Sequence, residues 1–134
     1  MQPDYDPRDV AAFRLHQARE CLKDANLEEN SLKTRANRSY YCIFNAMRAV
    51  LALDKFDSKR HSGIIDNFRK NYIKTGIFPK DFSNFVVDAF DIRLESDYED
   101  FYVVSKSKVN SQVEHAKTLL EAVEKYVGER IQNS

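Results

Sequence analysis

The segment 31–53 constrains the fold more than any other part of the chain, because a helix formed there has almost no polar side. At about 100° per residue, one broad face carries large apolar residues and a neighbouring strip carries small ones. The large residues are Tyr40, Ile43, Phe44, Met47, Val50 and Leu51, and the small ones are Cys42, Ala46 and Ala49. A helix that is apolar or small over most of its circumference lies at the centre of a bundle. We therefore expect this helix, capped by Ser31, to be central rather than peripheral.

Four more helices follow from apolar residues that repeat at helical spacing. We expect them at about 8–25, around 64–72, from Pro79 through the repeat at 82–90, and at about 105–131. Gly76 suits a left-handed helix cap, and Pro79 suits the first turn of the next helix. Because short connections make such helices antiparallel neighbours, the sequence predicts an all-α, up-and-down antiparallel helical bundle of four long helices plus a short extra helix. We expect one domain over residues 1–134.

Composition excludes several classes of protein. With three glycines and three prolines in 134 residues, neither an all-β fold nor a glycine-rich phosphate loop is expected. No 18-residue apolar run or basic-then-apolar leader occurs, so we expect no membrane span and no secretory signal, and a cytoplasmic location. Cys21 and Cys42 have no CxxC partner and are expected to be buried free thiols. The three histidines lack metal-ligand spacing, so neither a metal nor another cofactor is predicted.

Charge is balanced overall but unevenly distributed. The net charge of zero excludes a broad basic footprint for nucleic acid. Residues 55–80 hold seven Lys or Arg against two acids, whereas residues 88–100 hold six acids against Arg93 alone. These two segments could complement each other within the molecule, form a self-association surface, or be solvated helix faces.

Arg93 is the residue that least fits its surroundings in the sequence. The apolar repeat Phe82, Phe85, Val86, Ala89 and Phe90 continues onto Arg93. A buried guanidinium without partners costs several kcal/mol. Either Arg93 forms an ion pair with Asp97 one turn later, or it belongs to a polar site centred on residues 93–98.

Two other groups could belong to such a site. The polar strip of the central helix consists of Arg38, Tyr41, Asn45 and Arg48, and it is either solvated or one wall of a cleft. His61 precedes Ile64, Ile65 and Phe68 on the inward face of the third helix. The positive end of the helix dipole favours a neutral imidazole there, either as a structural histidine or as a site residue.

Three segments of the chain carry a resemblance to a known family: residues 37–49 (NRSYYCIFNAMRA), 59–63 (KRHSG) and 93–98 (RLESDY). In this order they resemble the corresponding segments of small prokaryotic HEPN-domain proteins, and the resemblance covers about 10–126. It implies an antiparallel bundle, usually a homodimer, with polar residues gathered near the dimer axis. Many such proteins are ribonucleases that use an arginine followed, after four to six residues, by a histidine. Some are toxins paired with a small nucleotidyltransferase, which in places adenylylates a tyrosine near that motif.

This chain departs from the ribonuclease motif. Arg93 matches the arginine, but the histidine window holds Tyr98, Glu99 and Asp100, and the next histidine is His115. Metal-independent RNA cleavage needs a general base and a general acid, for which histidine is best suited near neutral pH. Asp97 is a poor acid and Tyr98 a poor base at pH 7, so His61 would have to come from another helix or subunit.

Three functions therefore remain open. The first is a non-catalytic module that binds a nucleotide or nucleic-acid phosphate and partners a nucleotidyltransferase. Its phosphate contacts would be Arg38, Arg48 and Arg93, its stacking residues Tyr41 and Tyr98, and its base reader Asn45. The second is a metal-independent ribonuclease in which Arg93 stabilises the transition state while Asp97, Tyr98 or His61 moves protons. The third is a dimeric helical scaffold. Separately from these three functions, Tyr98 could accept an AMP group from a partner.

Overall fold

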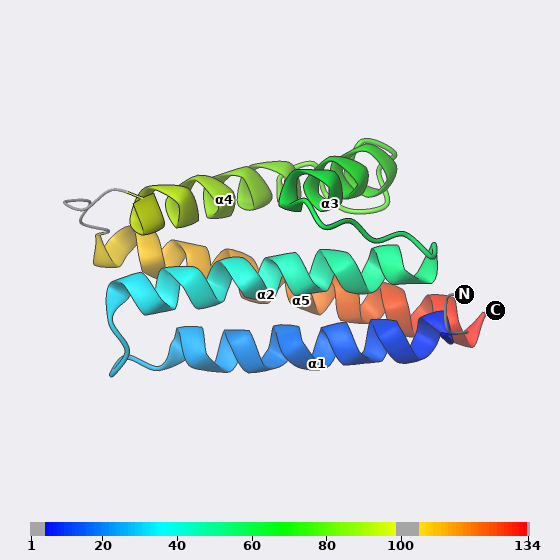
Figure 1. The fold of residues 1–134 in the computed structure, drawn as a ribbon, viewed down its shortest axis with the longest axis horizontal. Coiled ribbons are helices and arrows are strands. Elements are labelled where there is room, and N and C mark those ends of the chain that lie inside the picture. The colour runs from blue at the N-terminus through cyan, green and yellow to red at the C-terminus, as the bar shows by residue number, and fades with distance from the viewer. Residues whose placement is uncertain (1–4, 99–104, 134) are drawn as a thin grey trace.

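The computed structural model describes residues 5–98 and 105–133, and for residues 96–98 the backbone alone. Its helices are α1 (Pro7–Asn26), α2 (Leu32–Leu53), α3 (His61–Phe68), the short π-helix η1 (Arg69–Ile73), α4 (Phe82–Tyr98) and α5 (Lys106–Gln132). The helices α1, α2, α4 and α5 alternate in direction along the bundle (Figure 1), and α3 packs against α2. The predicted all-α bundle of four long helices and one short helix is thereby confirmed.

Local sequence signals place several of these helix ends. The side chain of Ser31 accepts a hydrogen bond from the backbone N–H of Thr34, as the predicted cap of α2 requires. Ser105 caps α5 in the same way through the N–H of Lys108. Gly76 has φ = 85°, the left-handed conformation expected at that break.

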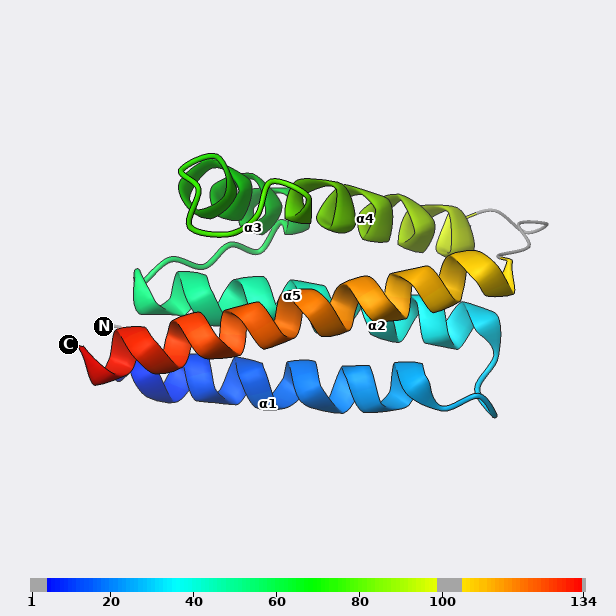
Figure 2. The same ribbon diagram turned by 180° about the vertical axis from the view of Figure 1, so that it is seen from behind.

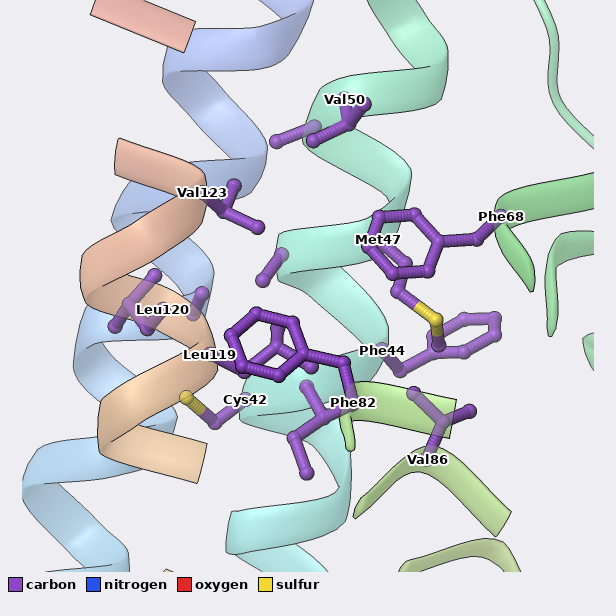
Figure 3. Packing of buried hydrophobic residues seen from close by; sticks show 14 of the residues in the cluster. Cys42, Phe44, Met47, Val50, Phe68, Phe82, Val86, Leu119, Leu120 and Val123 are labelled. Atoms are coloured by element: carbon purple, nitrogen blue, oxygen red, sulfur yellow. The ribbon is translucent and has the colours of Figure 1, made fainter. Parts of the chain in front are cut away.

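The helix α2 is the centre of the core, as predicted. It contacts α1, α3, α4 and α5, and it lies between its neighbours in both views of the bundle (Figures 1 and 2). Figure 3 shows side chains of α2 packed together with Leu119, Leu120 and Val123 of α5 and with Phe68, Phe82 and Val86. Burial of so much apolar surface on one helix is the main source of the bundle's stability.

Several alanines of α1 and α2 are fully enclosed. Ala11, Ala18 and Ala25 of α1 expose no surface, and neither do Ala46 and Ala49 of α2. Both cysteines are buried free thiols, as predicted, and burial raises the pKa of each. In the part of the chain that the structure describes, no helix is long and apolar enough to cross a membrane.

The third helix differs from the expectation at its C-terminal end. We expected one α-helix to include Tyr72, whereas α3 ends at Phe68 and the chain continues through the π-helical turn η1. The hydroxyl of Tyr72 donates to Asp54, just after α2, and accepts a hydrogen bond from Arg130 of α5. Arg130 also binds Asp54 at 2.6 Å. These contacts tie the end of α3–η1 to the ends of α2 and α5.

Candidate functional site

The site begins where His61, the first residue of α3, meets α2 and α4. Its Nδ1 atom lies 2.8 Å from the hydroxyl oxygen of Tyr40 and 3.4 Å from a terminal nitrogen of Arg93. The guanidinium carbon of Arg93 lies 5.3 Å and 5.6 Å from the ring centroids of Tyr40 and Tyr41. Arg93 therefore meets aromatic faces as well as the imidazole, an arrangement that stabilises a partly buried cation.

Aromatic rings of α2 hold the imidazole in place. The ring of Phe44 lies 4.3 Å from that of His61, and the ring of Tyr41 lies 6.0 Å from it and perpendicular. Tyr40 and Phe44 are only 1% and 5% exposed, so neither ring can move aside without opening the core. From the sequence we assigned both residues to the core face alone. Their spacing of four residues, which puts them on one helix face, was the signal that they act together.

The connection before α3 also positions His61. The hydroxyl of Ser58 accepts a hydrogen bond from the backbone N–H of Arg60. A Cβ atom at Gly63 would lie 2.5 Å from that Ser58 oxygen. A larger residue at position 63 would displace the Ser58 side chain from this arrangement, which favours glycine two residues after the histidine.

A cleft opens beside the imidazole. It has a volume of ≈ 470 Å³, within the range of small-molecule sites, and is lined by Phe44, Arg48, Asp57, Ser58, Lys59 and His61. Arg48 binds Asp57 at 2.8 Å and lies 5.8 Å from the Phe44 ring centroid. The sequence does not predict Asp57 as a site residue. Its only signal in the sequence is that it is an acid within the basic segment 55–80.

The remaining predicted site residues are arranged around Tyr41. Arg38 lies 5.5 Å from the Tyr41 ring centroid and donates to the side chain of Asn37. The side-chain amide of Asn45 donates to the backbone carbonyl of Tyr41, 2.9 Å away on its own helix. The structure thus brings Tyr41, His61 and Arg93 together, places Arg48 on the adjoining cleft, and links Arg38 and Asn45 to this group through Tyr41.

Other predictions concern residues outside this group. The side chains of Asp97 and Tyr98 lie outside the described residues. His115 lines a different cleft of ≈ 350 Å³ between α4 and α5, and its ring stacks on Phe85 with centroids 4.0 Å apart. Among ion pairs of the described residues, none joins the basic segment 55–80 to residues 88–95. The described residues also contain no cluster of three or more His, Cys, Asp or Glu that could hold a metal ion.

Burial and two cations keep His61 neutral. Partial burial, followed by the charges of Arg93 and Arg48, lowers the pKa of His61 below its ordinary value of 6.5. Burial also raises the pKa of Tyr40, and the opposing effect of Arg93 is smaller. At neutral pH the site therefore holds a neutral imidazole, a protonated phenol and a charged guanidinium.

The lowered pKa of His61 predicts a pH dependence of stability. As the pH falls below about 7, the unfolded chain takes up a proton at His61 before the folded protein does. The contribution of His61 to the free energy of unfolding therefore decreases as the pH falls from the ordinary pKa to the lowered pKa. Below both pKa values this contribution is constant. Urea denaturation across this pH range should show that the free energy of unfolding decreases less for His61→Gln than for the wild type. The exposed-histidine variant His16→Gln is the control, and an equal loss in wild type and His61→Gln would contradict the prediction.

Fold and site together define a class of protein: an antiparallel four-helix bundle with a cationic, aromatic-walled cleft at the start of its short extra helix. Comparison with known families is consistent with this description, since the family model described as HEPN domain matches residues 11–126. The chain belongs to the HEPN-domain family.

Individual relatives agree with this assignment. A Thermotoga maritima protein named "UPF0332 protein" is 31% identical over 120 residues, which cover 88% of this chain and 91% of the relative. An Archaeoglobus fulgidus protein of the same name is 35% identical over 73% of this chain and 79% of its own length. A Methanocaldococcus jannaschii protein named "Putative toxin MJ0142" is 25% identical over 68% of this chain and 62% of its own.

Proposed function

We propose that this protein is a HEPN module that binds the phosphate groups of a nucleotide or nucleic acid at the cleft beside His61. We further propose that it works with a small nucleotidyltransferase, as one half of a toxin–antitoxin-like pair. The observation that carries the first proposal is the convergence of Arg93 and His61, from α4 and α3, beside a cleft that also contains Arg48 and Lys59.

The charges around this cleft favour an anionic ligand. Arg48 and Lys59 line it together with a single acid, Asp57, and Arg93 contacts Nδ1 of the His61 imidazole. Guanidinium groups form strong, directional hydrogen bonds to phosphate oxygens. The half-buried ring of Tyr41 offers a face on which a base could stack. The guanidinium group of Arg38 also contacts this ring.

Titration with AMP and with a short oligoribonucleotide tests this proposal. We expect the wild type to bind and Arg93→Ala to lose about tenfold or more in affinity, equivalent to about 1.4 kcal/mol. Arg69→Ala is the matched control, because Arg69 is exposed and its side chain is hydrogen-bonded to Ser83, away from the cleft lining. Circular dichroism would establish that both variants fold. Wild-type binding that Arg93→Ala leaves unchanged, or no binding by the wild type, would reject the proposal.

The proposed partner follows from the family and from relatives whose names describe them as toxins. Co-expression with a small nucleotidyltransferase encoded beside this gene should yield a complex. If the partner adenylylates Tyr98, mass spectrometry will show the mass of one AMP group on the peptide that contains it. We also propose a homodimer, which sedimentation of the purified protein would test. Failure of the two proteins to copurify would count against the pairing.

A second candidate function is supported by one contact. The arginine–histidine pair that HEPN ribonucleases use is absent from the local motif of this chain, yet His61 lies beside Arg93 across 32 positions of sequence. A ribonuclease of this kind would arrest growth when expressed, and Arg93→Ala would abolish the arrest in a folded protein. Intact RNA after long incubation with pure protein would exclude it.

A further inference from the structure

Two hydrogen-bond donors converge on one nitrogen of His61. The hydroxyl oxygen of Tyr40 lies 2.8 Å from Nδ1, and a terminal nitrogen of Arg93 lies 3.4 Å from the same atom. A guanidinium group has five N–H donors and no acceptor. Arg93 can therefore bond to Nδ1 only when Nδ1 carries a lone pair rather than a proton.

The Tyr40 hydroxyl is the second donor. Its side chain is 1% exposed, and burial holds the phenol in its protonated form. If Nδ1 instead donated to the Tyr40 oxygen, an N–H of the imidazole and an N–H of Arg93 would point at each other. Donation by both Tyr40 and Arg93 to the lone pair of Nδ1 avoids this clash between donors.

A neutral imidazole with an unprotonated Nδ1 carries its proton on Nε2. No hydrogen bond to Nε2 occurs among the described residues, and this atom is not among their buried unsatisfied atoms. His61 itself lines the cleft. The ring thus offers the cleft an N–H donor and no lone pair.

We infer that Tyr40 is a positioning residue that, together with Arg93, holds His61 as the neutral Nε2–H tautomer, so that His61 donates to an unprotonated phosphate oxygen of the ligand. This inference rests on the proposed function, since it names the atom with which the cleft meets the phosphate. It also identifies the chemical class that the site selects at this position: a group with acceptors only, such as a phosphate diester or a fully ionised monoester. A ligand ammonium group, which has donors only, would meet another donor there.

The same tautomer separates the two candidate functions. A general base must accept a proton through a lone pair directed at the substrate. In His61 the nitrogen with the lone pair is Nδ1, which is already bonded to Tyr40 and Arg93. His61 is therefore suited to bind phosphate and unsuited to deprotonate a ribose 2′-hydroxyl.

Nitrogen-15 NMR of the imidazole rings tests the inference directly, because protonated and unprotonated ring nitrogens have well-separated shifts. In wild-type protein at mildly alkaline pH we expect His61 to show an unprotonated Nδ1 and a protonated Nε2. The exposed His16 provides an internal reference ring. In Tyr40→Phe the difference between the two His61 shifts should shrink toward that of His16. A protonated Nδ1 in the wild type, or an unchanged spectrum in Tyr40→Phe, would overturn the inference.

A titration with AMP on the same samples separates this inference from the proposed function. We expect the Nε2 signal of His61 to shift on binding and Tyr40→Phe to bind roughly three- to tenfold more weakly, the effect of one weakened hydrogen bond to a charged group. The backbone amide spectrum of the variant shows whether it is folded. If the tautomer is as expected but the wild type binds no AMP and no oligoribonucleotide, the proposed function fails and the tautomer assignment stands. If the ligand binds while Nδ1 is protonated, the inference fails and the proposed function stands.

Discussion

Replacing Phe68 by alanine is expected to lower the free energy of unfolding by about 3–5 kcal/mol. Phe68 is the last residue of α3 and exposes no surface. Its ring stacks on Tyr72 and Phe78, with centroids 5.8 Å and 5.5 Å away. The substitution removes a large buried side chain and leaves a cavity, because rings held by several neighbours cannot close the gap. Chemical denaturation monitored by circular dichroism measures the change.

A second phenylalanine provides the matched control for this prediction. Phe13 lies on α1 and is 52% exposed, so Phe13→Ala should change stability by less than about 1 kcal/mol. Since a domain of this size is stable by only about 5–15 kcal/mol, the two variants should differ clearly in midpoint. A Phe68→Ala protein as stable as Phe13→Ala would mean that the ring is not part of the core.

Replacing Arg35 by alanine is expected to lower the free energy of unfolding by about 2–4 kcal/mol. Arg35 is a cation in α2 that is only 5% exposed. Its Nε donates to the carbonyl of Ala25 near the end of α1 at 2.8 Å, and a terminal nitrogen donates to Asn110 of α5 at 3.1 Å. Truncation leaves a buried carbonyl without this partner and removes the packed side-chain stem. Three helices lose a shared contact at one end of the bundle.

Two further variants separate the causes of this effect. Arg35→Met keeps most of the apolar stem but none of the hydrogen bonds, so it should recover part of the loss. Arg19→Ala removes an exposed arginine that forms an ion pair with Glu124 at 3.1 Å, with side-chain exposures of 48% and 37%. Such a surface pair contributes about 0–1 kcal/mol. Equal effects of Arg35→Ala and Arg19→Ala would show that the buried guanidinium has no special role.

Helix positions in this protein are largely a local property, which is why the sequence predicts them. The cap at Ser31 depends on the backbone three residues later, and the left-handed Gly76 depends on its own missing side chain. The apolar repeats of α2 and α5 likewise report which face of each helix is buried. These signals lie within a few residues of the feature they specify.

The end of α3 shows where such reasoning stops. Nothing within residues 64–73 indicates a π-helical turn, and the sequence pattern alone favoured a continuous α-helix. In the structure Tyr72 bonds Asp54 and Arg130, which lie 18 and 58 positions away. The contacts made by η1 thus involve residues that lie outside any short window of sequence around it.

The candidate site divides in the same way. The chain itself identified Arg93, as a charge on an apolar stripe, and His61, as a polar residue on an inward face. Their contact, and the roles of Tyr40 and Phe44 in holding the imidazole, join α2, α3 and α4. Asp57 is recognised as part of the site only because the structure shows its ion pair with Arg48.

The sequence by itself determined the all-helical class, the central position of α2 and the residues with unusual chemistry, because helical periodicity and charge can be read from neighbouring residues. Tertiary structure alone decided which of those residues meet, and with which atoms. Hydrogen bonds act over about 3 Å, whereas Tyr40 and Arg93, which meet in this site, are separated by 53 positions of sequence. Folding of the helices against one another is what converts a list of candidate side chains into a site with one orientation of the imidazole.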